Sequence, residues 1–210
     1  MSERKKIYFY IAANLAMLIP VPGRLAYAII LLLLFNIQML ASTMLFHAIH
    51  HMKLANMRNT LLCLTIIALG IFYKQIVIFF CPIIALTLSY CIFLPTLTSV
   101  IIEFFFLDYA RGVRTHISST MKKSCFMTGF NLVFFLLRDV IGYGTITLPG
   151  WKTMFVIHLP YSQQKIGLGV FLATIPGSLC FIALLLALYI FAVKKISILK
   201  NASLLDEGGI

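Results

Sequence analysis

The sequence predicts an all-α integral membrane protein with six transmembrane helices. Of its 210 residues, 61% are hydrophobic and 11% are charged, whereas a typical soluble domain has about 25% charged residues. Apolar segments of membrane-spanning length recur along the chain, and most basic residues lie between them. This length allows one membrane domain, residues 1–210, and no large domain outside the bilayer.

Six apolar segments are candidates for these helices, since a span needs about 20 mostly apolar residues. The first, residues 7–20, is short, and we expect a half-helix that begins at one interface and ends inside the bilayer. A secretory signal is the alternative for it, but the aromatic residues 8–10 favour a retained segment. The other predicted spans are residues 25–47, 60–80, 83–107, 124–141 and 169–193.

The distribution of Lys and Arg predicts that both termini lie in the cytoplasm, because cytoplasmic loops of membrane proteins are enriched in these residues. With the N-terminus inside, twelve basic residues fall on the cytoplasmic side and three outside. The twelve are Arg4, Lys5, Lys6, Lys53, Arg58, Arg111, Arg114, Lys122, Lys123, Lys194, Lys195 and Lys200, and the three are Arg24, Lys152 and Lys165. Residues 194–210 then form a cytoplasmic tail. The net charge of +11 is explained by lipid headgroups, and no nucleic-acid partner is expected.

Helix-breaking residues mark two of the six segments. Pro20, Pro22 and Gly23 end the first segment, and Pro95 lies in the middle of the fourth. Proline removes a helical hydrogen bond, and freed backbone groups at membrane depth need protein or a wet cavity around them. The first and fourth segments would open two inverted three-helix repeats, residues 7–80 and 83–193, each with a broken first helix. Two ordinary proline kinks are the alternative.

Three ionisable residues are candidates for buried polar groups or an ion path. Arg138 and Asp139 follow an apolar run and precede a glycine-rich turn. They are either an interfacial arginine with a helix stop or buried charges that face a partner or a path. Glu103 lies among Ile and Phe residues, and it is either interfacial or a ligand for an ion or proton.

No metal site or catalytic residue is predicted. His47, His50 and His51 share one helix face, but no acidic or cysteine partner lies nearby in the sequence. The five cysteines include no C-x-x-C pair, so neither a disulfide framework nor a zinc site is indicated. Phosphate-binding loops, dinucleotide fingerprints and nucleophile elbows are not found.

Several stretches together resemble the Rnf/Nqr family of small membrane subunits. Residues 136–146 read Leu-Leu-Arg-Asp-Val-Ile-Gly-Tyr-Gly-Thr-Ile, and residues 175–179 read Ile-Pro-Gly-Ser-Leu, followed by Ala-Leu-Leu-Leu-Ala-Leu at 183–188. Residues 92–98 are similar to the pattern of the family's fourth span, and residues 23–26 to the start of its second. The resemblance covers most of the chain and is best over residues 92–188.

This resemblance implies a role in an ion-translocating electron-transport complex linked to ferredoxin or NADH, in the bacterial cytoplasmic (inner) membrane. The partner would be a sister six-span subunit of opposite topology, with this chain on the RnfE/NqrD side of the pair. The family also shares an iron–sulfur cluster between the two subunits, held by one cysteine from each broken half-helix. Here no cysteine precedes Cys63, and Cys91 is the candidate ligand in the second half. We therefore expect no cofactor bound by this chain alone, and a structural, ion-path or electron-relay subunit rather than an enzyme.

A second class of function fits the same size and charge. The chain also resembles the six-span substrate-capture subunits of vitamin importers, with a candidate binding loop at residues 142–165. Such sites are concave and mostly apolar, with a few polar groups.

Overall fold

The computed structural model describes residues 19–52, 55–106, 113–151, 153–160, 167–184, 187, 188, 191 and 195. This part of the chain is mostly helical, and four of its helical segments are long and apolar enough to cross a membrane. These are Leu25–Ile49, Arg58–Phe80, Pro82–Val100 and Arg114–Tyr143. A mostly helical fold with several segments able to span a membrane is therefore confirmed, while six spans and the inverted repeat stay predictions.

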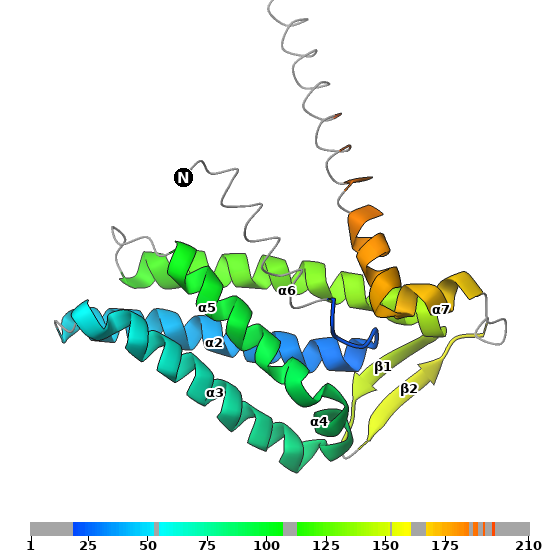
Figure 1. Cartoon of the computed structure of the whole chain (residues 1–210), viewed down its shortest axis with the longest axis horizontal. Coiled ribbons are helices and arrows are strands. Elements are labelled where there is room, and N and C mark those ends of the chain that lie inside the picture. Colours follow the sequence, from blue (N-terminus) through cyan, green and yellow to red (C-terminus); the bar gives the residue numbers. More distant parts are fainter. Residues whose placement is uncertain are drawn as a thin grey trace, which may run out of the picture.

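The helix α2 (Leu25–His51) is the centre of the bundle. It packs along α6 (Val113–Tyr143) and also contacts α3 (Arg58–Phe80), α5 (Leu94–Phe106) and the first strand (Figure 1). A helix of 27 residues is about 40 Å long, which exceeds the roughly 30 Å hydrocarbon core of a bilayer. Its first half is apolar on all sides and almost fully buried, because other elements surround it.

The helix α3 has the opposite environment. It follows a short turn of 3-10 helix, Ala55–Met57, and its apolar side chains point mostly outward. Leu64, Phe72 and Phe79 are 67%, 65% and 78% exposed. An apolar helix with so much exposed surface requires lipid or another membrane protein around it.

The fourth segment is interrupted, as the sequence predicts, but the position differs. It consists of α4 (Pro82–Leu88), the 3-10 turn η2 (Ser89–Phe93) and α5. The break begins at Ser89, whose φ is 39°. Pro95 lies in the first turn of α5. Backbone N–H groups in a first turn have no acceptor within the helix, so proline there removes no helical hydrogen bond. Proline at this position starts the second part of the segment and does not itself cause the break.

Residues 7–18 lie outside the described residues, so the predicted first half-helix is not seen. The breakers that follow it form a turn, in which the backbone N–H of Arg24 donates to the carbonyl of Pro22 at 2.8 Å. Val21 and Gly23 are buried within this turn. The turn ends where α2 begins.

The helix α6 is longer than predicted at its N-terminal end. It begins at Val113, whereas the apolar pattern starts at Ser124. The added turns are polar and include the exposed Lys122 and Lys123. A helix of 31 residues is about 46 Å long, so this polar end reaches beyond the hydrocarbon layer.

A β-hairpin follows α6, and the all-helical prediction does not include it. Strand β1 (Thr145–Pro149) pairs antiparallel with β2 (Met154–His158), with Thr145 opposite His158. Gly144 makes the sharp exit from α6 because its φ is 62°, a conformation that glycine adopts without steric cost. Its N–H still donates to the carbonyl of Val140 at 3.0 Å.

The final predicted span, residues 169–193, is not one unbroken helix. The structure has α7 (Gly167–Ala173), a bend at Thr174, and a second apolar helix, Ile175–Leu184. The Thr174 hydroxyl caps the second helix by accepting a hydrogen bond from the Gly177 N–H at 3.3 Å. Pro176 occupies the first turn of that helix, where proline is favoured. The expectation of a single helix over this segment was therefore wrong.

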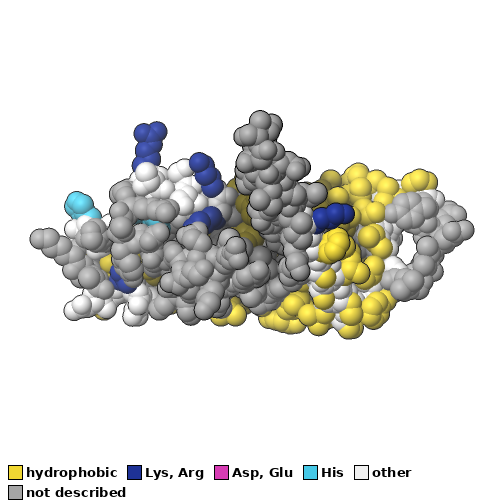
Figure 2. All heavy atoms as spheres, turned by 90° about the horizontal axis from the view of Figure 1, so that it is seen from above, with side chains coloured by type: hydrophobic (Ala, Val, Ile, Leu, Met, Phe, Trp, Pro, Cys, Tyr) yellow, Lys and Arg dark blue, Asp and Glu magenta, His cyan; other side chains and the backbone are white. Residues whose placement is uncertain are grey.

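Four of the eight basic residues whose side chains are described lie at one end of the bundle. Arg58 begins α3, and Arg114, Lys122 and Lys123 lie in the first third of α6. Figure 2 shows Lys and Arg mostly over this half of the viewed face, and hydrophobic side chains over the half toward the hairpin. The separation is that expected for a protein with one basic membrane surface. Which surface faces the cytoplasm stays a prediction.

Candidate functional site

Arg138 is buried near the C-terminal end of α6 and binds carbonyl groups from two other segments. Only 1% of its surface is exposed. One terminal nitrogen, Nη1, donates to the carbonyl of Val21 at 2.9 Å, and Nη2 donates to Ala173 at 2.8 Å and to Thr174 at 3.3 Å. The Nε group donates to Leu172 at 3.3 Å. The guanidinium thus binds the turn before α2 and caps the C-terminal end of α7, where the helix dipole favours a positive charge.

Asp139 is fully buried beside it and binds the other side of the same region. Its Oδ2 atom accepts hydrogen bonds from the backbone N–H of Leu25 at 3.2 Å and of Thr147 at 2.8 Å. The hydroxyl of Thr147 also donates to Oδ2 at 2.7 Å, and that of Thr145 donates to Oδ1 at 2.9 Å. Leu25 is the first residue of α2, and the positive end of a helix dipole stabilises a carboxylate at this position.

We call Arg138, Asp139 and the groups that bind them the α6 brace. It joins the turn before α2, the N-terminus of α2, strand β1 and the bend after α7. The Thr147 hydroxyl extends it by accepting a hydrogen bond from the Ala26 N–H at 3.2 Å. Because both charged side chains are buried and hydrogen-bonded within the protein, Arg138 does not snorkel to the interface. An ion-path role for either residue stays a prediction.

Small residues allow the backbone to approach the brace closely. A Cβ atom on Gly23 would lie 2.8 Å from Nε of Arg138. A Cβ atom on Gly142 would lie 2.8 Å from the Cβ of Ala173, on α7. Larger side chains at either position would push the turn or α7 away from α6. These two glycines are therefore required by close packing rather than by backbone conformation.

The break in the fourth segment contacts the turn that precedes α2. Cys91, in the break of the fourth segment, is 4% exposed, and its thiol donates to the carbonyl of Pro20 at 3.8 Å. Pro20 belongs to the turn that follows the first segment. Within the described residues, no three His, Cys, Asp or Glu side chains lie close enough to hold a metal ion. A shared iron–sulfur cluster therefore remains an implication of the resemblance.

A buried polar cluster lies deeper in the bundle, where the sequence analysis did not expect one. Gln38 on α2 donates to the Thr96 hydroxyl at 2.7 Å and to the Ile66 carbonyl at 3.2 Å. The Ser99 hydroxyl donates to the Gln38 side-chain oxygen at 3.4 Å. Gly70 permits this contact, since a Cβ atom there would lie 2.7 Å from the Thr96 hydroxyl oxygen. The cluster joins α2, α3 and α5.

A second polar contact joins α2 to α6. The amide of Asn36 donates to the Thr128 hydroxyl at 2.7 Å and accepts a hydrogen bond from the Ser124 hydroxyl at 2.7 Å. The side chain of Glu103, the third predicted polar candidate, lies outside the described part of the structure. The Gln38 and Asn36 contacts thus join helices through neutral side chains, whereas the α6 brace uses charged ones.

Of the predicted histidine face, the structure describes the side chains of His47 and His51. His47 Nε2 lies 3.3 Å from Nδ1 of His116, which comes from α6. The Phe46 ring packs edge-on against both imidazoles, with its centroid 5.3 Å from that of His47 and 5.8 Å from that of His116. The guanidinium of Arg58 lies over the Phe46 ring, 5.6 Å from its centroid. His51 is exposed. The contact is an aromatic packing site between helix ends.

Comparison with known proteins gives no family assignment. No protein-family model, no curated protein and no solved structure matches the chain. The family likeness therefore depends on the quoted sequence motifs alone.

Proposed function

We propose that the chain is a membrane subunit of an ion-translocating electron-transport complex of the Rnf/Nqr type. Its role would be to hold the transmembrane frame and pack against a sister six-span subunit in the bacterial inner membrane. Electron transfer would be carried out by partner subunits, with this chain at most relaying electrons.

One observation carries the proposal, which is the meeting of separate motifs at the α6 brace. Residues 136–146 contain Arg138 and Asp139. Arg138 binds carbonyls immediately before the motif at residues 175–179, and Asp139 accepts the N–H of Leu25, within residues 23–26. These motifs are far apart in the sequence. Their contacts in one buried site support the proposal that they belong to a single structural frame.

The contact between Cys91 and Pro20 supports the same proposal. The resemblance implies a cluster held by one cysteine from each broken half-helix, and here Cys91, in the break of the fourth segment, contacts Pro20 in the turn before α2. Discontinuous helices at matching positions in two halves are typical of membrane proteins with a central functional path. The exposed apolar surface of α3 gives a partner subunit or lipid a large area to contact.

Copurification tests this proposal. The full chain, tagged and expressed at its native level in its own host, is solubilised in mild detergent and its bound proteins are identified by mass spectrometry. We expect membrane redox subunits to copurify, and Asp139→Ala to release them by loosening the frame. The matched control is Gly129→Ala on α6, whose added Cβ meets no atom within 4 Å. Recovery of the intact chain without any membrane redox subunit would refute the proposal.

The importer alternative has a different signature in the same experiment. It predicts a copurifying ATPase and a small vitamin-like molecule bound to the purified chain. The loop proposed as its binding site, residues 142–165, contains the β-hairpin, and Thr145 and Thr147 of that hairpin are occupied by Asp139. This occupation makes the loop less suited to capturing a ligand.

A further inference from the structure

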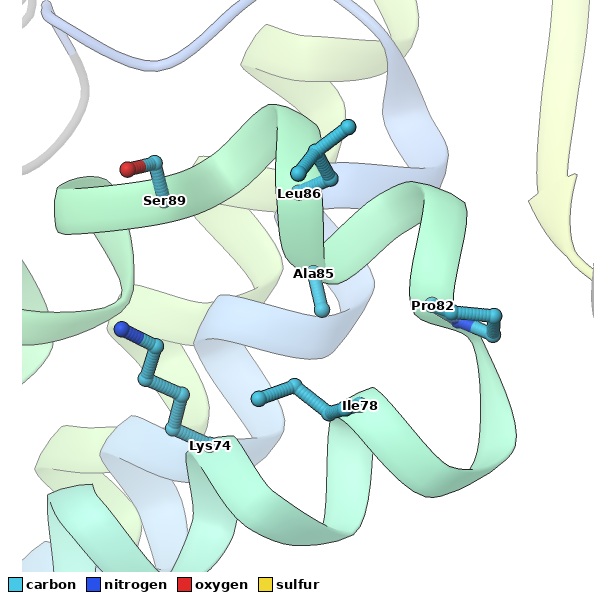
Figure 3. Close-up of a pocket in the computed structure, with 6 residues that line it drawn as sticks. All are labelled: Lys74, Ile78, Pro82, Ala85, Leu86 and Ser89. Atoms are coloured by element: carbon cyan, nitrogen blue, oxygen red, sulfur yellow. The ribbon is translucent and has the colours of Figure 1, made fainter.

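A pocket of about 370 Å³ opens between α3 and α4, away from the α6 brace. We call it the α3–α4 pocket. It is lined by Lys74 and Ile78 of α3 and by Pro82, Ala85, Leu86 and Ser89 of the broken fourth segment. Figure 3 shows Lys74 reaching from α3 toward the part of the fourth segment that carries Ser89. One charged side chain therefore lies among mostly apolar and small ones.

Lys74 lies at membrane depth, and its ammonium is directed further inward. Six residues separate it from Phe80, the last residue of α3, which corresponds to about 9 Å along the helix axis. The Phe80 ring contacts Trp151, with ring centroids 5.1 Å apart. Trp151 is 68% exposed, and exposed tryptophans are typical of the membrane–water interface. Helical side chains tilt toward the N-terminus of their helix, and the Lys74 ammonium lies over the Phe93 ring, away from this interface.

The positive charge of Lys74 has no acidic partner in the described part of the chain. Asp139 is the one acidic residue whose side chain is described, and it is bound within the α6 brace. The Lys74 ammonium lies 5.3 Å from the centre of the Phe93 ring. A cation–π contact of this kind stabilises an ammonium but does not neutralise it. Charged side chains inside membrane spans pair with a group of opposite charge or face a wet cavity.

The helix break beside the pocket is uncovered on its outer side. Ser89 has a φ of 39°, which is unusual for a residue other than glycine, and both Ser89 and Tyr90 are exposed. Irregular backbone at membrane depth occurs where protein covers it or where it lines a water-filled cavity. A neighbouring protein that covered this break would meet Lys74 in the same place, because both residues border one pocket.

We propose that the α3–α4 pocket is the docking site for a transmembrane helix of a different membrane protein. That helix carries an Asp or Glu whose carboxylate pairs with the Lys74 ammonium. The small residues Ala85 and Ser89 let a second helix approach closely, as is common between membrane helices. Leu86, which is 83% exposed, packs against the side of that helix.

Charge favours a different chain over a second copy of this one. A two-fold contact between copies uses the same surface on both partners, so it would bring two Lys74 ammonium groups together. The site needs a partner in the same membrane, as the proposed function does. It does not require that this partner be a redox subunit.

Site-specific photocrosslinking in the native host tests the pocket. The full chain carries p-benzoylphenylalanine in place of Leu86 and is irradiated in intact cells, and the crosslinked peptide is sequenced by mass spectrometry. We expect an adduct with one membrane protein, through a transmembrane segment that contains Asp or Glu. The same probe in place of Phe126, which is exposed on α6, is the control for nonspecific capture.

Charge changes at Lys74 separate an ion pair from simple proximity. Lys74→Gln should reduce the yield of the adduct about tenfold, the lower end of the range for close charge pairs between proteins. Lys74→Glu should abolish the adduct, because like charges across an interface repel. Replacing the partner's carboxylate with lysine should restore the adduct of Lys74→Glu, which would also show that this variant folds. Lys123→Gln removes the same charge from α6 and should leave the yield unchanged.

The possible adducts distinguish the occupants of the pocket. An adduct with phospholipid alone, or a covalent dimer of this chain, would overturn the proposal. So would a partner adduct whose yield Lys74→Glu leaves unchanged. The proposed function is judged separately: a contact restored by the reciprocal exchange, with a membrane protein that has no redox role, would support the pocket and refute that function. Redox subunits that copurify without reacting with the probe at position 86 would do the reverse.

Discussion

Replacing Asp139 with alanine should release the β-hairpin and weaken the start of α2. The carboxylate accepts two buried backbone N–H groups, from Leu25 and Thr147. Leaving a buried donor without a partner costs about 1–3 kcal/mol. The loss of stability expected from these two groups is therefore roughly 2–6 kcal/mol. The hydroxyls of Thr145 and Thr147 can rotate to other acceptors, so they add less.

The single tryptophan provides a local assay for this change. Trp151 lies in the turn between β1 and β2 and packs against Phe80. We expect Asp139→Ala to change the emission of Trp151 as the hairpin separates, and to lower the free energy of unfolding measured in mixed micelles. Thr147→Val, which keeps the Asp139 carboxylate, should lower the free energy of unfolding by about 1 kcal/mol.

A surface control separates this effect from nonspecific damage. The hydroxyl of Thr87 is exposed and bonds within its own helix, to the Ile83 carbonyl, so Thr87→Ala should alter stability by less than about 0.5 kcal/mol. The reasoning is refuted if Asp139→Ala changes the free energy of unfolding by less than about 0.5 kcal/mol and leaves the emission of Trp151 unchanged.

Three further substitutions test the packing of the bundle by the same unfolding assay. Gly142→Ala should destabilise by about 1–3 kcal/mol because its Cβ would overlap α7, whereas Gly129→Ala should stabilise by about 0.5–1 kcal/mol; equal effects would contradict close packing at the brace. Gln38→Leu should lower the free energy of unfolding by about 0.6–1.7 kcal/mol, the range for polar contacts between membrane helices. Gln75→Leu, on the exposed face of α3, should leave it measurably unchanged. Ser89→Gly should stabilise by about 1 kcal/mol by relieving the positive φ, and a loss of stability there would show that the conformation is not strained.

The helices could be predicted from the sequence because membrane spans depend mainly on local composition. The predicted segments 25–47 and 60–80 correspond to α2 and α3 with small shifts at their ends. The start of α6 was missed because its first turns are polar, and hydropathy reports where a helix enters lipid rather than where it begins. The bend at Thr174 was missed for a related reason, since apolar residues continue through it.

The β-hairpin had a detectable signal that the helical pattern outweighed. Thr145, Ile146 and Thr147 are β-branched residues with polar and apolar side chains in alternation, and Gly150 lies in the connecting turn. This pattern is typical of a hairpin. In a chain this hydrophobic, the segment is instead interpreted as part of a loop, residues 142–165.

The candidate site was only partly accessible from the sequence. Arg138 and Asp139 are candidates from the sequence, and the structure buries both, but the sequence left open whether they face lipid headgroups or protein. That choice depends on carbonyls and N–H groups contributed by segments up to 117 residues away along the chain. Gln38 and Asn36 carried no signal, because a single amide in an apolar helix is uninformative until its partners are known.

An experimental structure of the full chain in a lipid nanodisc tests the central claim most directly, at a resolution that shows the Arg138 side chain. We predict density for the guanidinium between the carbonyls of Val21 and Ala173, with β1 held against the start of α2 by Asp139. A guanidinium directed into the headgroup layer, with the hairpin detached from α2, would contradict the account.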